Sequence, residues 1–240
     1  MPEGTPTRPL RAHEGFYWVE DFIGNDSVAD AALGQTRMEL VTIGNASTLA
    51  LQTGFAGGVL RITTAATADG DGEVLRLFTD GLALGGAGGG FSMRFRHTTA
   101  ITSDIRWGWQ DSVTATDPAV GLFIMSDSGV MSLHSDSTNG DQDVAAAGGG
   151  SLTSGTTAIV DTWHYAEMIY TGANGNGGPN LATLYVDGSP ATGVASLYPV
   201  IGSAETGELS LVHYQNTGGA AARIIDLDFL EAWQWIDRNG

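Results

Sequence analysis

The chain has 240 residues and a formal net charge of -17, from 27 acidic and 10 basic side chains, and every basic residue is arginine. This acidity disfavours a duplex nucleic acid or an anionic membrane as partner, because binding to either requires a basic surface. The absence of cysteine excludes disulfides, thiolate metal sites and a cysteine nucleophile. The content of 42% hydrophobic and 15% charged residues is typical of a globular domain.

Residues 1–15 are predicted to form an extended N-terminal arm, because they contain Pro2, Pro6 and Pro9 and offer little to bury. The same segment lacks the apolar stretch of a secretory signal peptide. We therefore expect a protein assembled inside a cell. We also expect a single domain, which spans residues 16–240.

Beyond the arm, short runs of alternating apolar and polar residues predict β-strands, separated by turn formers such as Gly, Asn and Asp. The predicted strands cover residues 16–22, 38–43, 48–52, 58–64, 73–78, 91–96, 105–110, 120–125, 130–134, 162–170, 181–186, 209–213 and 223–235. The glycine run at 84–90 is predicted to be a mobile loop. No run of ten or more residues has a convincing helical pattern, so the sequence favours an all-β fold of two antiparallel sheets.

The most informative pair of strands spans residues 162–170 and 181–188. The first begins with Trp163 and His164, and the second ends in Leu-Tyr-Val-Asp-Gly. Asp187 and Gly188 predict a tight turn, because glycine accepts a positive φ.

This pair resembles the concanavalin A-like and laminin G-like jelly-roll superfamily, whose members often carry Trp-His, a loop and then Leu-Tyr-Val-Asp-Gly. The run at 225–229 looks like the closing strand of that sandwich. The resemblance implies a two-sheet antiparallel jelly roll. Segments 16–24, 57–67 and 107–111 look like parts of jelly-roll proteins from tailed-bacteriophage virions.

The phage resemblance implies a structural protein of the virion, of the capsid decoration, head fibre or tail-associated kind. Its partners would be other virion subunits, such as the major capsid or tail protein, and we expect a homo-oligomer, with a trimer favoured. The superfamily resemblance implies an alternative, a lectin-like module that binds a surface glycan, with calcium as a candidate cofactor. We expect no catalytic activity and no other cofactor.

Two tryptophan pairs are candidates for binding a glycan or a partner: Trp107 with Trp109, and Trp233 with Trp235. Each pair has period-2 spacing, so both indoles lie on one face of a strand. An outward-facing pair would form an aromatic platform, and an inward-facing pair would be core. The alternation around Trp107 and Trp109 favours core, whereas Trp233 and Trp235 are also candidates for a subunit contact.

A candidate calcium site is formed by Asp69, Asp71 and Glu73, which place three carboxylates within five residues. Carboxylate oxygens suit a hard cation, although the spacing is not that of an EF-hand loop. The alternative is a solvated turn.

The final strand contains Asp226, Asp228 and Glu231, which resemble the Glu-x-Asp-x-x-Glu motif of laminarinase-type glucanases. In those enzymes the carboxylates serve as nucleophile and general acid. Here the first residue is Asp, the motif lies at the end of the chain, and Glu231 falls on the opposite face unless a bulge intervenes. We therefore expect an exposed acidic strand face instead of a catalytic site.

Overall fold

The structure is a computed structural model that describes residues 15–22, 32–33, 38–52, 58–77, 84, 88–99, 102–112, 114–137, 150–173, 179–190, 196–197, 201, 205–215 and 221–235. These residues form two antiparallel sheets and contain no helix, so none is long and apolar enough to cross a membrane. The predicted all-β, two-sheet fold is confirmed. Of the predicted arm, only Gly15 is described, and it begins the first strand.

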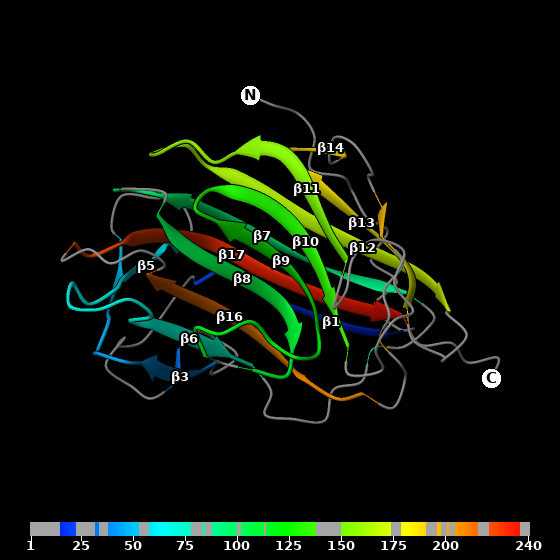
Figure 1. The fold of residues 1–240 in the computed structure, drawn as a ribbon, viewed down its shortest axis with the longest axis horizontal. Coiled ribbons are helices and arrows are strands. Elements are labelled where there is room, and N and C mark those ends of the chain that lie inside the picture. Colours follow the sequence, from blue (N-terminus) through cyan, green and yellow to red (C-terminus); the bar gives the residue numbers. More distant parts are fainter. Residues whose placement is uncertain are drawn as a thin grey trace.

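Sheet A is nine-stranded, and its main path has seven strands in the spatial order β14-β13-β12-β7-β17-β5-β4. Their bounds are β14 (Ser189–Pro190), β13 (Pro179–Val186), β12 (His164–Ala173), β7 (Gly89–His97), β17 (Ile224–Trp235), β5 (Leu60–Thr63) and β4 (Thr48–Leu51). In addition, β1 (Gly15–Glu20) pairs with β17, and β15 (Ser196–Leu197) pairs with β13. In Figure 1 the long strand β17, in red, runs beside β7 through the middle of the molecule.

Sheet B is eight-stranded, with the order β11-β10-β9-β8-β16-β6-β3-β2. Its strands are β11 (Gly150–Thr157), β10 (Val130–Asp136), β9 (Gly121–Asp127), β8 (Ser103–Gln110), β16 (Glu208–Gln215), β6 (Gly72–Arg76), β3 (Met38–Ile43) and β2 (Ala32–Leu33). Each sheet combines pairs of consecutive strands with pairs that are distant in sequence, such as β7 with β17 in sheet A and β8 with β16 in sheet B.

The main core lies between the sheets and is built by alternation along the strands. Phe91, Met93 and Phe95 of β7 point into it, as do Trp107 and Trp109 of β8. Because side chains alternate between faces, Ser92 and Arg94 lie on the outer face of sheet A.

The Trp-His and Leu-Tyr-Val-Asp-Gly segments form one hydrogen-bonded unit. Asp187 and Gly188 have φ values of 50° and 79°, as a two-residue type I′ hairpin turn requires, which confirms the predicted turn. The Asp187 carboxylate accepts hydrogen bonds from Tyr165 N–H at 2.8 Å and from His164 Nδ1 at 2.9 Å. His164 Nε2 accepts from Ile159 N–H at 3.0 Å, so the proton is on Nδ1. These hydrogen bonds therefore hold the end of β13 against the start of β12.

Part of the glycine run departs from the prediction of a mobile loop, whereas residues 85–87 lie outside the described residues. Gly89 and Gly90 belong to β7 and pair with both β12 and β17. A Cβ atom at Gly89 would lie 2.7 Å from Tyr170 Cζ, in the core. Glycine is required here because large rings occupy the space that side chains would fill.

Candidate functional site

The outer face of sheet A carries a bulge that changes which acidic residues share a face. Leu227 pairs with Phe95, but Phe229 pairs with Arg94, so Asp228 is an extra residue in β17. Beyond the bulge Glu231 shares the outer face with Asp226. The bulge that is needed to bring all three carboxylates of the glucanase-like motif onto one face is therefore present.

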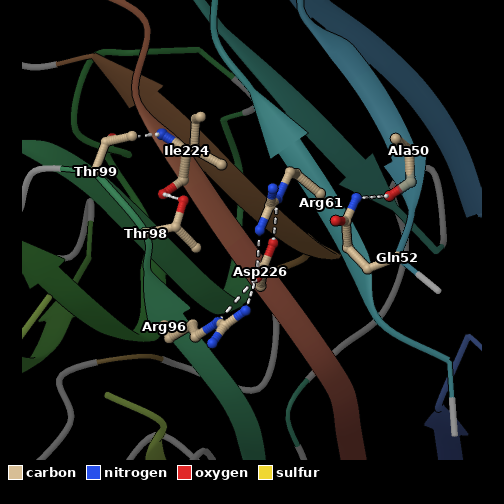
Figure 2. Close-up of polar contacts among 8 residues, drawn as sticks. All are labelled: Ala50, Gln52, Arg61, Arg96, Thr98, Thr99, Ile224 and Asp226. Carbon is tan, nitrogen blue, oxygen red and sulfur yellow. Dashed lines mark hydrogen bonds and ion pairs between the residues drawn. The ribbon is translucent and has the colours of Figure 1, made fainter. Parts of the chain in front are cut away.

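Both carboxylate oxygens of Asp226 nevertheless accept hydrogen bonds from arginine side chains. Arg61 Nε and Nη2 donate to its carboxylate at 2.7 and 2.9 Å, and Arg96 Nε and Nη2 donate at 2.9 and 2.7 Å. Figure 2 shows the two guanidinium groups approaching Asp226 from β5 and β7. The Asp226 side chain is fully buried, so the geometry is that of a structural ion-pair centre.

A second ion pair continues along the same face. Arg94 pairs with Asp228, and the Arg94 and Arg96 guanidinium carbons lie 5.1 and 5.0 Å from the ring centroid of Trp163. These distances are within the range of a cation–π interaction. Trp163 of the Trp-His segment is thus held against the arginines.

Two glutamates flank a serine in the next row of the face. Ser92 of β7 lies between Glu167 on β12 and Glu231 on β17. Ser92 Oγ donates to Glu231 Oε2 at 2.6 Å. Glu167 is buried and Glu231 is partly buried, so Glu231 is the carboxylate that this row offers as an acceptor beside the tryptophans of β17.

The end of β17 forms an aromatic platform, which we define as Tyr17, Trp233 and Trp235. A Cβ atom at Gly88 would lie 2.8 Å from Trp235 Cε3, and one at Gly90 would clash with Trp233, so both indoles pack against glycine backbone. Trp233 is buried, whereas Trp235 and Tyr17 remain 42% and 49% exposed. Tyr17 pairs with Trp233 across β1 and β17. Trp235 thus rests on the sheet and keeps part of its ring exposed.

The first tryptophan pair has a different environment. Trp107 and Trp109 are both completely buried in the main core. The Trp107 ring packs against Trp18, at 5.8 Å between ring centroids, and against Phe91 at 6.4 Å. The structure therefore places this pair in the core, the alternative that the sequence alternation favours.

The three candidate calcium ligands lie apart in the structure. Asp71 accepts hydrogen bonds from Asn45, Thr67 and Ala68, which lower its pKa to about 2. Glu73 is buried on β6, where it accepts from Thr42 Oγ1 at 3.3 Å, and Asp69 is exposed. Within the described ranges, no three His, Cys, Asp or Glu side chains converge to hold a metal ion.

Between the sheets, two histidines and a glutamate form a buried polar cluster. His213 of β16 pairs with Glu73 of β6, and neither of its ring nitrogens has a hydrogen-bond partner in the described structure. His97 Nε2 lies 3.4 Å from Ser126 Oγ. Burial lowers the pKa of His97 to about 4 and that of His213 to about 3, and raises that of Glu73 to about 7.

We expect these histidines to make the fold sensitive to acid. The unfolded chain binds protons on both below a pKa of about 6.5. The free energy of unfolding should therefore fall as the pH drops from about 6.5 towards the folded values near 4 and 3. Glu73 acts in the opposite direction, because its contribution is present below its unfolded pKa of 4.5 and is lost as the pH rises through about 7.

Urea unfolding of Glu73→Gln at about pH 7, 6, 5 and 4, roughly the interval between these pKa values, removes the opposing contribution of Glu73. The stability of this variant should decline steadily towards pH 4, and adding His213→Leu should make the decline smaller. A pH profile that stays the same when His213→Leu is added would contradict the assignment.

The connection between β8 and β9 covers the middle of the outer face of sheet B, around Arg106 and Tyr214. Arg106, which is fully buried, donates to the carbonyl oxygens of Thr114 and Thr116, the latter at 2.7 Å. Ala115 packs against a small cluster that includes Val212 and Tyr214. The outer face of sheet A is therefore the better candidate for binding a ligand.

Sequence reasoning did not identify Tyr17, Glu167 or Ser92 as parts of the candidate site. The alternation in residues 16–20 does indicate that Tyr17 and Val19 share a face, because both have period-2 spacing. It does not reveal that this face continues across Trp233, which is more than two hundred positions away and becomes a neighbour only through β1–β17 pairing.

Comparison with solved structures finds similar folds at low sequence identity. An endo-β-1,4-glucuronan lyase from the fungus Trichoderma reesei matches with a TM-score of 0.55 and 14% identity, over 92% of this chain and 95% of the lyase. Alginate lyase vAL-1 from Chlorella virus matches with a TM-score of 0.56 and 12% identity, over 82% and 93%. The carbohydrate recognition domain of Emp47p matches with a TM-score of 0.54 and 12% identity, over 94% and 99%.

The protein therefore has a concanavalin A-like jelly-roll fold, as the sequence resemblance implied. No protein-family model and no curated protein matches the chain. The similar structures include both lyases and a recognition domain, so the fold alone does not decide between catalysis and binding.

Proposed function

We propose that the protein is a carbohydrate-binding module that holds a glycan on the outer face of sheet A. The observation that supports this proposal best is Trp235, whose indole packs on the backbone of Gly88 while 42% of the residue remains exposed. A tryptophan held in this way is a rigid, amphipathic surface on which the apolar face of a sugar ring stacks.

Neighbouring side chains supply the polar part of such a site. Tyr17 extends the aromatic surface, and Glu231 adds carboxylate oxygens that accept hydrogen bonds from sugar hydroxyls. Apolar stacking beside a few placed polar groups is the usual composition of small-ligand sites. The carbohydrate-related proteins among the similar structures are consistent with this proposal.

Trp235→Ala tests the proposal directly. We expect it to weaken glycan binding by at least tenfold, because truncating a central aromatic anchor typically costs 2 kcal/mol or more, about a 30-fold change. The measurement is a glycan array followed by calorimetry on the best ligand, with calcium and with EDTA, since a role for calcium stays a prediction. Val130→Ala, an exposed apolar residue on sheet B, is the matched control. Equal binding by both variants would refute this site.

We propose binding without catalysis. Of the glucanase-like carboxylates, Asp226 is held by two arginines and Asp228 by one. A carboxylate neutralised in this way is poorly suited to act as a nucleophile or general acid. Incubation with β-glucans should therefore release no reducing ends.

A second candidate function is that of a structural protein in a tailed-phage virion, acting as a homo-oligomer, with a trimer favoured. The same platform and the neighbouring Val19 support it, because Tyr17 and Val19 on β1 and Trp235 on β17 expose large side chains with apolar surface. Exposed aromatic clusters of this kind also mark protein–protein contacts. In this role the partners would be the major capsid or tail protein, and the location would be the virion.

Light scattering coupled to size-exclusion chromatography separates the two functions. A virion protein that uses this platform should form oligomers that Trp235→Ala dissociates, and it should bind purified particles. A monomer that binds glycans and no particles would favour the first proposal.

A further inference from the structure

We infer that the glycan bound by the platform is electrically neutral, and that a polyuronate or an amino-sugar polymer is a poorer ligand. This inference rests on the proposed carbohydrate-binding function and concerns the class of glycan. It is supported by the charges around the platform and by the distribution of arginines on the outer face of sheet A.

The arginines on this face are committed to carboxylates. Arg61 and Arg96 both bind Asp226, and Arg94 pairs with Asp228. Arg94 and Arg96 also lie against Trp163. A uronate that recruited one of them would have to break an existing ion pair, so these groups are weak anion receptors.

A negatively charged side chain adjoins the platform in the described structure. Glu231 precedes Trp233 by two residues on the same face of β17, a separation of about 7 Å along a strand. Glu167 lies two strands from Glu231 in the same row, with Ser92 between them. A uronate stacked beside Trp233 would therefore approach the like charge of Glu231.

The charge of the whole chain acts in the same direction. At a net charge of -17, the protein repels polyanions at long range and slows their association. Like charges brought together at an interface also discriminate strongly against the wrong ligand. A polyuronate would thus be disfavoured both in approach and at the site.

Neutral sugars avoid these costs and match the available groups. Their hydroxyls donate to carboxylate oxygens such as those of Glu231, and bonds to an ionised acceptor are stronger than neutral ones. Their C–H faces stack on Trp235 and Tyr17. A cationic amino-sugar polymer would be attracted by the net charge and by the Glu231 carboxylate, and this electrostatic attraction should weaken steeply with salt.

The test compares four purified polymers by affinity electrophoresis and calorimetry: laminarin and xylan as neutral glycans, alginate as a polyuronate, and chitosan as a polycation. Each is measured at low salt and at near-physiological salt, about 0.15 M. We expect one neutral glycan to bind with nearly the same affinity at both salt concentrations. Alginate should bind at least tenfold more weakly, and chitosan should lose most of its binding in salt.

Glu231→Gln is the diagnostic variant, and Glu39→Gln on sheet B is its matched control. The glutamine side chain still accepts from Ser92, and circular dichroism checks that the fold is kept. Glu231→Gln should weaken the neutral glycan severalfold and reduce the discrimination against alginate, whereas Glu39→Gln should change neither.

Two failures are distinguishable. If wild-type protein prefers alginate, or binds chitosan alone in a salt-resistant manner, the neutral-glycan inference is overturned while carbohydrate binding stands. If no polymer binds, or Trp235→Ala binds as wild-type does, the proposed site itself is refuted and the inference with it.

Discussion

Asp226→Ala should lower the free energy of unfolding by about 3–5 kcal/mol, the typical effect of removing one partner from a buried ion pair. The Asp226 side chain is fully buried, and the side chains of Arg61 and Arg96, which bind it, are each more than two-thirds buried. Without the carboxylate, two positive charges would face each other with their desolvation uncompensated. Urea unfolding at neutral pH measures the loss.

Two controls separate charge from packing. Asp228→Ala removes the partner of Arg94. The Asp228 side chain is 22% exposed and that of Arg94 is 43% exposed, so this change should lower the free energy of unfolding by only about 0–1 kcal/mol. Replacing Asp226 by Leu together with Met at both Arg61 and Arg96 should be less destabilising than Asp226→Ala, because no charge is left unpaired. A small effect of Asp226→Ala would show that the centre contributes little to stability.

Trp107→Ala should destabilise the protein by about 3–5 kcal/mol, the usual cost of truncating a buried tryptophan. Trp107 is fully buried and packs against Trp18 and Phe91 at the junction of the two sheets. The substitution would leave a cavity that the paired strands of a close-packed sandwich fill only in part. Thermal and urea unfolding measure this effect.

The companion variants distinguish the roles of the two tryptophan pairs. Trp107→Phe keeps much of the ring volume and should stay folded, with glycan binding unchanged. Trp235→Ala should change stability by less than about 1 kcal/mol, since the residue is substantially exposed. If Trp107→Phe lowered the affinity for the glycan as much as Trp235→Ala does, the assignment of Trp107 to the core alone would be contradicted.

The sequence by itself determined the fold class. Alternation such as Phe91-Ser92-Met93-Arg94 requires a strand with one apolar face, and Asp187-Gly188 requires a turn with two positive φ values. Both are local properties, because the geometry of a strand or a tight turn depends on adjacent residues.

The candidate site was decided only by the tertiary structure. The bulge at Asp228 moved Glu231 onto the face of Asp226, which strict period-2 counting does not give. Gly88 and Gly90 became supports for Trp235 and Trp233 because β7 pairs with β17. Which strands become neighbours depends on burying two whole sheets against each other, a global balance that no single stretch of sequence contains.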